Sequence, residues 1–254
     1  TALLQRVGRR VQLTNAGLVM VDSARTILRE IDRMQTAVAN LAGEPAGTVR
    51  LAIFQSASFA LLPRAIKYLE EHAPRLILHV LQIDPETGTS LTRSREYDMV
   101  LSEAYPHHPI PEYPDLHSEL LVEDPLSLIV PEESSIKSLK EANELPWVLE
   151  MEQNTSRQWA INQCRTVGFE PDIRYSANDM ITNANLVRSG CATTIVPGFV
   201  LSSLSNTKGI RTVDLPGKPS RKIFTAVRTE SAKNPALVMV RDALQHAVKE
   251  AFGS

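Results

Sequence analysis

The residues best suited to bind a ligand are polar side chains that come shortly after predicted strands. Six such residues form the first candidate set, namely Ser56, Ser58, Ser102, Glu103, Asn154 and Thr155. Hydroxyl and amide groups can satisfy a small polar molecule without adding net charge. Ser56 and Ser58 also precede a predicted helix, where free backbone amides and the positive helix end favour an anion. A carboxylate is the simplest ligand for such a site.

Glu103 is the one ionisable residue of this set. If its carboxylate faces the ligand, it repels a plain dicarboxylate and attracts an ammonium group, which favours an amino acid or another amine. Two alternatives stay open. Glu103 points to solvent, and the two serines only cap a helix, which stabilises it by about 1 kcal/mol without a ligand.

Signatures of catalysis and metal binding are not found in the sequence. It has no Walker-type loop, no G-x-S-x-G elbow and no H-E-x-x-H helix, and it offers no set of nucleophile, base and orienting residue. His107, His108 and His117 lie in or just beyond a proline-rich stretch, without the fixed geometry that a metal needs. Cys164 and Cys191 are too few for a disulfide framework. We predict no catalytic residue, no metal and no cofactor.

The sequence predicts alternating strands and helices, and these elements would position the polar residues. In the first half, strands are predicted at 49–54, 76–83 and 99–102, a turn at 55–58, and helices at 59–72 and 85–95. This order is typical of a parallel sheet with right-handed crossovers. Ligands of such sheets lie beyond the carboxyl ends of the strands, which is where the polar residues stand.

A second alternating unit follows the proline-rich stretch 105–114. Its extended segments are predicted at 116–122, 126–130, 147–151, 173–176, 193–196 and 221–227, and its helices at 155–165, 179–188 and 235–252. Two α/β units with crossing segments between them enclose a cleft, which is the natural place for a small ligand.

One long helix, 15–41, precedes both units. Its apolar residues recur at alternating steps of four and three, and they are Met20, Ala24, Ile27, Ile31, Met34, Val38 and Leu41. The helix would be roughly 40 Å long at about 1.5 Å per residue. So narrow a stripe usually packs against another helix, which predicts dimerisation. The alternative is an amphipathic helix that lies on its own domain.

Positive charge is concentrated at the front of the chain. The whole chain has a net charge of −2, whereas residues 1–43 hold six arginines against three acidic residues, a local charge of +3 that leaves −5 for the rest. Arg6, Arg9 and Arg10 stand close together around a predicted turn at Gly8. They form either a phosphate-binding patch or a solvated face. No apolar run is long enough to span a membrane and no secretory signal is evident, so we expect a cytoplasmic protein with no membrane partner.

Three stretches together resemble the LysR-type transcriptional regulators. They are RVGRRVQLTNAG at 6–17, GTVRLAI at 47–53 and LVRSGCATTIVP at 186–197. The resemblance implies an α/β fold, a two-lobed effector domain like the type 2 periplasmic binding proteins, preceded by a long linker helix. It further implies a remnant of a winged helix-turn-helix at 1–14, a linker and dimerisation helix at 15–42, lobe I at 47–121 and 228–254, and lobe II at 122–227.

The resemblance also implies partners. The family binds promoter DNA through the full-length protein, binds a small-molecule effector in the cleft, and forms homodimers that often pair into tetramers. It would place Arg6, Arg9 and Arg10 near DNA phosphates, and Asn178 and Thr193 at the cleft. The competing hypotheses are a cytoplasmic solute-binding protein and an enzyme on the same two-lobed fold.

The sequence departs from the family pattern in three places. The recognition helix that should precede Thr1 is missing, which indicates a fragment of a longer protein. Ala192 replaces the second glycine of the turn in lobe II. The closely spaced cysteine pair of the family's peroxide sensors is not evident, so we do not expect a redox sensor.

Overall fold

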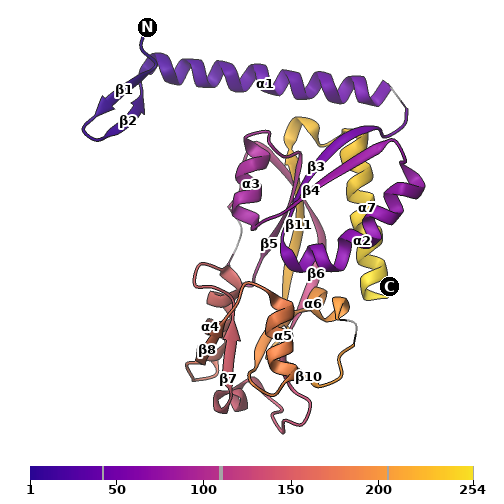
Figure 1. Ribbon diagram of the computed structural model, residues 1–254. Helices are drawn as coiled ribbons and strands as arrows, with labels where there is room; N and C mark the ends of the chain where they lie inside the picture. The colour runs from indigo at the N-terminus through magenta and orange to yellow at the C-terminus, as the bar shows by residue number, and fades with distance from the viewer. Residues whose placement is uncertain (42, 109–110, 205, 254) are drawn as a thin grey trace.

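A β-hairpin and a long helix lie at one end of the molecule, beyond two α/β lobes stacked end to end (Figure 1). The computed structural model describes residues 1–41, 43–108, 111–204 and 206–253. The hairpin consists of β1 (Leu4–Val7) and β2 (Arg10–Leu13), and the helix is α1 (Asn15–Leu41). Both were predicted from the sequence. No helix in the described part of the chain is both long and apolar enough to cross a membrane.

The hairpin and α1 form one local unit. Gly8 at the hairpin turn has a φ of +63°, a conformation that glycine adopts without strain. Thr14 is the N-cap of α1, because its Oγ1 accepts a hydrogen bond from the backbone N–H of Gly17 at 3.1 Å. A Cβ atom on Gly17 would lie 2.2 Å from the carbonyl oxygen of Leu3, so glycine is required where the hairpin crosses the helix.

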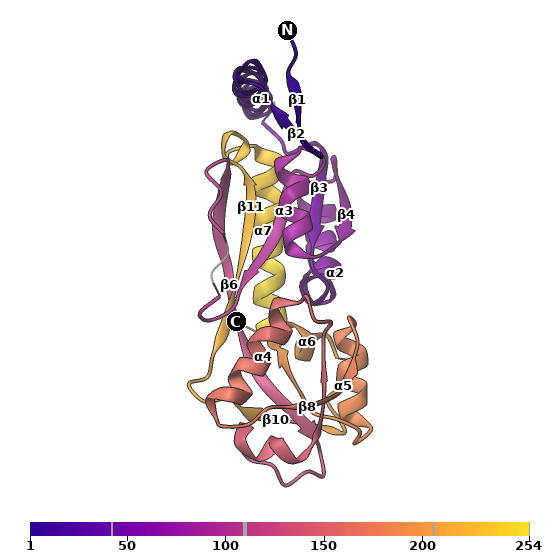
Figure 2. The same ribbon diagram turned by 90° about the vertical axis from the view of Figure 1, so that its left-hand side faces the viewer.

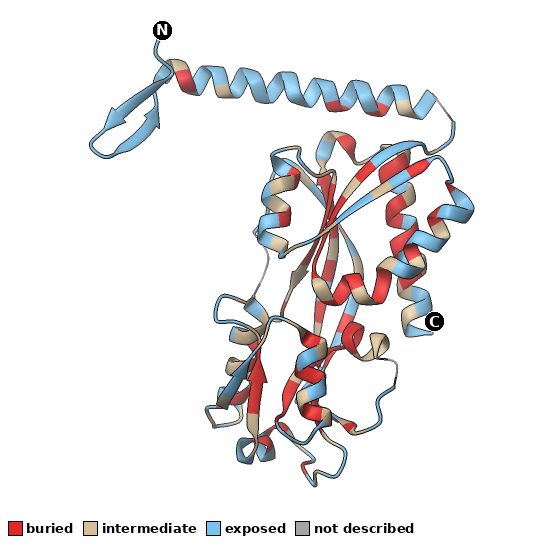
Figure 3. Ribbon diagram, in the orientation of Figure 1, coloured by how far each residue is buried: buried red, intermediate tan, exposed pale blue. Residues whose placement is uncertain are grey.

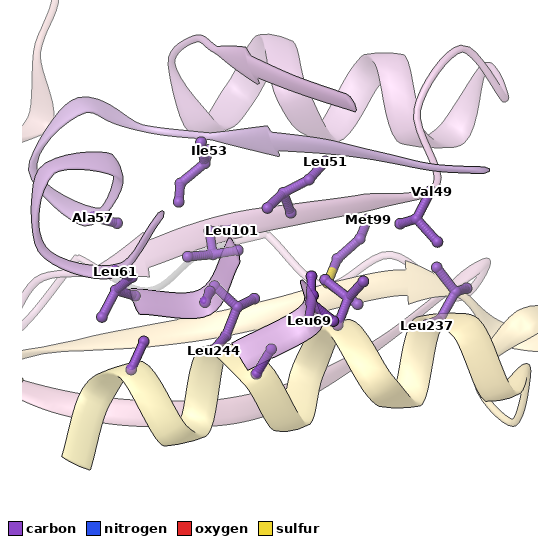
Figure 4. Packing of buried hydrophobic residues seen from close by; sticks show 14 of the residues in the cluster. Val49, Leu51, Ile53, Ala57, Leu61, Leu69, Met99, Leu101, Leu237 and Leu244 are labelled. Carbon is purple, nitrogen blue, oxygen red and sulfur yellow. The ribbon is translucent and has the colours of Figure 1, made fainter. Parts of the chain in front are cut away.

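Lobe I is an open sheet covered by helices on both faces. β3 pairs in parallel with β4 and β5, as predicted, and β11 pairs antiparallel with β5 and β6. The elements of this lobe are β3 (Gly47–Ile53), α2 (Gln55–His72), β4 (Leu76–Gln82), α3 (Pro85–Arg93), β5 (Met99–Ala104), η2 (Thr229–Ser231) and α7 (Pro235–Phe252). Its main core lies between the sheet, α2 and α7, and includes Leu51, Leu61, Met99 and Leu244 (Figure 4).

Lobe II is joined to lobe I by two strands that cross between the lobes (Figure 2). These are β6 (Leu116–Pro131) and β11 (Ser220–Arg228), and β6 goes on to pair with β9 and β10 in lobe II. The other elements of lobe II are η1 (Leu139–Glu144), β7 (Pro146–Leu149), α4 (Thr155–Thr166), β8 (Asp172–Ser176), α5 (Met180–Arg188), β9 (Thr194–Pro197), α6 (Gly198–Ser203) and β10 (Ile210–Asp214). Trp147 and Trp159 are fully buried in its core.

Two local predictions were wrong. Residues 55–58 were predicted as a turn, but they form the first turn of α2, which begins directly after its N-cap residue Phe54. Residues 116–122 and 126–130 were predicted as two extended runs, but they belong to the single strand β6. Pro125 lies within this strand, where it is paired with Ser220. Part of the proline-rich stretch, residues 109 and 110, lies outside the described residues.

The apolar stripe of α1 faces away from lobe I. Asp32 and Thr36, on the opposite side of the helix, are buried against the lobe. The stripe residues Ile27, Met34, Val38 and Leu41 are 59% to 88% exposed, and Figure 3 shows most of α1 as exposed. The helix therefore lies on its own domain through a polar face. Its apolar face is left without a partner within the described part of the chain.

Candidate functional site

A fully buried arginine lies at the boundary between the two lobes. The Nε and Nη2 atoms of Arg221 donate to Asp124 Oδ2 at 2.9 and 2.7 Å, and Nη2 also donates to Ser56 Oγ at 2.8 Å. Its Nη1 donates to Glu103 Oε2 at 2.5 Å and to the hydroxyl of Tyr105 at 3.4 Å. Each guanidinium nitrogen thus has an acceptor from the chain itself. We call these five residues the cleft network.

The cleft network draws on elements from across the fold. Arg221 and Asp124 come from the crossing strands β11 and β6, Glu103 from the end of β5, and Ser56 from the first turn of α2. Lobe II contributes the N–H of Phe199 at the start of α6, which donates to Asp124 Oδ1 at 3.1 Å. The network therefore ties the crossing strands to both lobes.

The N-termini of α2 and α5 also meet across the lobe boundary. The backbone N–H of Met180, the first residue of α5, donates to Gln55 Oε1 at 3.1 Å, and Gln55 is the first residue of α2. Both helix ends therefore point toward the same boundary, where their positive dipoles favour negative charge.

Glu150 supplies a further carboxylate on the lobe II side. It follows β7, and its side chain accepts hydrogen bonds from Asn154 Nδ2 at 3.1 Å and from the hydroxyl of Ser156. Glu150, Ser156 and Asn183 line a cavity of about 20 Å³, which is room for one water molecule. Asn183 is 3% exposed and its Oδ1 has no hydrogen-bond partner among the described residues.

Burial shapes the electrostatics of the site. Loss of solvation raises the pKa of Glu103, Asp124 and Glu150 above the ordinary carboxyl range. Arg221 opposes this rise by its charge, and it does so through direct hydrogen bonds at Glu103 and Asp124. Glu150 has only hydroxyl and amide donors on its side chain. It is the carboxylate of these three whose charge is least compensated.

Replacing Glu150 by glutamine should stabilise the protein at high pH. A carboxyl whose pKa is raised by folding stabilises the fold below its ordinary pKa near 4.5 and loses that contribution as the pH rises through the folded value. Neutral glutamine avoids the loss, while its amide can still bond Asn154 and Ser156. We expect a higher unfolding free energy than wild type in urea at pH 8 and little difference at pH 4.

The exposed neighbour Glu152 provides the matched control. Glu152→Gln removes the same charge two residues away and should change stability by no more than about 0.5 kcal/mol at either pH. A Glu150→Gln variant that is less stable than wild type at pH 8 would show that the ionised carboxylate is favourable where it lies.

Of the predicted ligand-binding residues, Ser56 and Glu103 lie at the lobe boundary, whereas Asn154 and Asn178 form hydrogen bonds within lobe II. Ser56 and Glu103 belong to the cleft network, and Asn154 bonds Glu150. Asn178 Oδ1 accepts from the N–H of Met151 at 3.4 Å. The alternative that Glu103 points to solvent was wrong, because its carboxylate binds Arg221. Its binding of a ligand's ammonium group stays a prediction.

The other predicted ligand-binding residues are less well placed. Ser102 is buried and its Oγ has no partner in the described residues, whereas Thr155 is exposed at the start of α4. Ser58 Oγ donates to Gln55 O and Gln82 Oε1, both at 2.7 Å. Thr193 is 0% exposed and its Oγ1 donates to Ile129 O. The hydroxyls of Ser58 and Thr193 are therefore engaged inside the lobes.

Sequence reasoning missed Arg221, Asp124 and Tyr105. Arg221 lies two residues before the mainly apolar run 223–227, and Asp124 lies between the apolar residues 120–122 and 128–130 of β6. A charged residue next to a run of apolar strand residues is a usable signal, because burial of a charge requires a partner. Which strand supplies the partner depends on register, and that is not visible in one sequence.

The remaining residues discussed from the sequence are the arginines at the front of the chain, the two cysteines and the possible metal ligands. Arg6, Arg9 and Arg10 are exposed on the β1–β2 hairpin. Cys164 is buried in α4, where burial raises the pKa of its thiol to about 12, and Cys191 is exposed. Over the described residues, no group of three His, Cys, Asp or Glu side chains could hold a metal ion.

Two α/β lobes joined by crossing strands, with a buried polar network between them, define a two-lobed ligand-binding domain. Residues 42–249 match the LysR substrate binding domain. The chain belongs to the LysR family of transcriptional regulators.

Comparison with individual proteins agrees with this assignment. The chain is 22% identical over 249 residues to the hydrogen peroxide-inducible genes activator of Haemophilus influenzae, covering 97% of this chain and 82% of that protein. It is 24% identical over 219 residues to the transcriptional dual regulator GltC of Bacillus subtilis, covering 84% and 71%. These relatives are transcription regulators and not enzymes.

Solved structures show the same fold. An OxyR mutant from Corynebacterium glutamicum aligns with a TM-score of 0.70 at 20% identity, over 99% of this chain and 79% of that one. The reduced form of the OxyR regulatory domain from Pseudomonas aeruginosa aligns with a TM-score of 0.67 at 17% identity, over 80% of this chain and 98% of that one.

Proposed function

We propose that this chain is the effector-binding and oligomerisation region of a DNA-binding LysR-type regulator, which senses a small carboxylate or amino acid between its lobes. Residues 1–14 belong to the DNA-binding domain, 15–42 form the dimerisation helix, 47–121 with 228–254 form lobe I, and 122–227 form lobe II. The cleft network is the observation that carries the proposal, because buried charges at a lobe boundary respond to any charged group that enters.

The geometry of Arg221 favours an amino acid over a plain carboxylate. All three guanidinium nitrogens of Arg221 already donate hydrogen bonds within the chain. A carboxylate ligand must therefore displace an acceptor such as Glu103. A displaced Glu103 would be buried without a partner, which is costly. An α-amino acid avoids this cost, because its carboxylate can bind Arg221 while its ammonium group binds Glu103. Both charges of the protein then stay paired.

Under this proposal, α1 and the β1–β2 hairpin bind the partners of the regulator. The exposed stripe of α1 would pack against the same helix of a second copy, giving a homodimer and, through pairing of dimers, a homotetramer. Arg6, Arg9 and Arg10 would contact promoter DNA phosphates, which position a protein without specifying sequence. Such a regulator would act in the cytoplasm. Effector binding would shift the population of lobe or subunit arrangements and so change the grip on DNA.

Peroxide sensing is the second candidate, because several relatives are named as hydrogen peroxide-inducible activators. Peroxide reacts with thiolates. The pKa of Cys164, raised to about 12, keeps that thiol protonated at neutral pH. Cys191 is exposed, and nothing in the cleft network involves it. We therefore favour a small-molecule effector.

A thermal-melt screen tests the proposed function. Ligand at about a hundred times its dissociation constant adds roughly 2.7 kcal/mol, which corresponds to a rise of roughly 5 to 10 °C at this chain length. We expect hits among proteinogenic amino acids, weaker or no hits among plain carboxylates, and no shift with hydrogen peroxide. A peroxide-induced shift that Cys191→Ser abolishes would favour the second candidate instead.

A further inference from the structure

The strand that carries Arg221 into the cleft network also carries an arginine to α1. Arg228, at the other end of β11, places Nε 3.3 Å from Asp32 Oδ2 and Nη2 3.3 Å from Asp98 Oδ1. Asp32 is on α1 and is only 3% exposed. Each end of the nine-residue strand β11 thus takes part in its own group of ion pairs. Arg221 does so at the lobe boundary and Arg228 does so under α1.

α1 is held on lobe I mainly by polar contacts. Asp32 Oδ1 accepts from Arg95 Nη1 at 2.5 Å, and Arg33 donates to both carboxylate oxygens of Glu230 at 2.7 and 3.0 Å. Thr36 Oγ1 donates to the backbone carbonyl of Glu230 at 3.2 Å. Asp32 with Arg95, Arg228 and Asp98 is here called the helix contact. Polar contacts of this kind are sensitive to small displacements, because each needs a defined donor and acceptor geometry.

β5 runs beside β11 and takes part at both ends. Glu103 near the end of β5 binds Arg221, and Asp98 directly before β5 binds Arg228. The antiparallel register between the two strands is continuous from Lys222–Ala104 to Val227–Met99. On its other side, β11 pairs with β6 through a register shift between Ile223 and Phe224. The unbroken ladder is therefore the one that joins the two groups of ion pairs, and it runs lengthwise through lobe I toward α1 (Figure 1).

We propose that the β5–β11 ladder couples the cleft network to the helix contact, so that a change at Arg221 and Glu103 alters how firmly α1 is held by Arg228. This rests on the proposed function, since it makes the cleft the site whose occupancy α1 reports. A group that separates Arg221 from Glu103 removes an ion pair that holds the cleft end of the two strands together. The ladder hydrogen bonds then transmit any shift of β11 against β5 to the pair of Arg228 and Asp98.

The test compares two substitutions of the same kind on β5 and β6, the two strands that flank β11. Glu103→Gln removes a charge from the cleft network, whereas Glu123→Gln removes an exposed charge that pairs with Lys222, the neighbour of Arg221. Hydrogen exchange of the ligand-free chain is measured at the amides of residues 28–36. We expect exchange in Glu103→Gln to be about threefold faster or more, because weaker docking lets the helix open more often. Exchange in Glu123→Gln should equal wild type.

The reverse experiment starts from the helix. Asp32 lies outside the cores of both lobes, so the Asp32→Asn variant should still fold. The variant should speed hydrogen exchange at residues 220–224, at the cleft end of β11. Equal exchange in Glu103→Gln and Glu123→Gln, or no effect of Asp32→Asn on β11, would overturn the proposal. No effector is used in either experiment. If the melt screen finds no ligand but the exchange experiments show coupling, the proposed effector is wrong and the coupling stands. If the screen finds a ligand but exchange shows no coupling, the coupling is wrong and the proposed function stands.

Discussion

Replacing Ile27 and Ile31 by aspartate should convert dimers of this chain into monomers. The two side chains are 62% and 38% exposed in the isolated chain, on the face of α1 that points away from lobe I. Burying one fully exposed isoleucine contributes about 1.5–3 kcal/mol. The exposed fractions of the four isoleucines in a dimer amount to about two full side chains, so their burial contributes roughly 3–6 kcal/mol. Every 1.4 kcal/mol is about tenfold in the dissociation constant. Sedimentation velocity at micromolar concentration measures the outcome.

The control is Arg25→Asp, which adds negative charge to the same helix on the side opposite the stripe. Arg25 is 70% exposed in its side chain and forms only a loose pair with Asp22 at 3.6 Å, so the variant should stay dimeric. A wild-type chain that sediments as a monomer would contradict the dimerisation helix, as would a double variant that remains dimeric.

Replacing Asp124 by alanine should destabilise the fold by about 3–5 kcal/mol, the usual cost of removing one partner of a buried ion pair. Asp124 is 0% exposed and accepts two of the hydrogen bonds that Arg221 donates. Without it, the buried guanidinium keeps only Glu103 as a charged partner among the described residues, and the N–H of Phe199 loses its acceptor. The midpoint of urea unfolding at pH 7 measures the loss.

Glu123 supplies the comparison, since it is the adjacent residue on the same strand. Its carboxylate is 55% exposed and lies 3.7 Å from Lys222, so Glu123→Ala should cost no more than about 1 kcal/mol. The triple variant Asp124→Leu, Arg221→Met and Glu103→Gln should be more stable than Asp124→Ala alone, because it leaves neither a guanidinium nor a carboxylate of the cleft network buried without its charged partner. Equal effects of Asp124→Ala and Glu123→Ala would mean that the cleft network contributes little to stability.

The fold was largely predictable because several of its strands are mainly apolar runs. Residues 49–54 and 76–83 show this pattern, and the structure has strands at Gly47–Ile53 and Leu76–Gln82. Predictions failed where local turn propensity competed with the fold. The sequence Gln-Ser-Ala-Ser at 55–58 is typical of a turn, yet it continues directly into α2, where Ser56 Oγ accepts from Arg221.

The candidate site was predictable only in part. Ser56 and Glu103 were identified because they follow strands of the first unit. Their partner Arg221 lies 165 and 118 residues away in the chain, and only the antiparallel return of β11 through the sheet brings it there. Strand order and register depend on packing of the whole sheet. The central residue of the site was therefore beyond the reach of local patterns.

Calorimetric titration shows whether a small effector binds at Arg221 and Glu103. The amino acid with the largest effect in the melt screen is titrated into wild type, Glu103→Gln and Glu123→Gln. Loss of a charge-assisted hydrogen bond costs about 1.5–3 kcal/mol, so Glu103→Gln should bind at least about tenfold more weakly, while Glu123→Gln should match wild type. Equal affinity of Glu103→Gln and wild type would contradict the account, because it would place the ligand away from the cleft network.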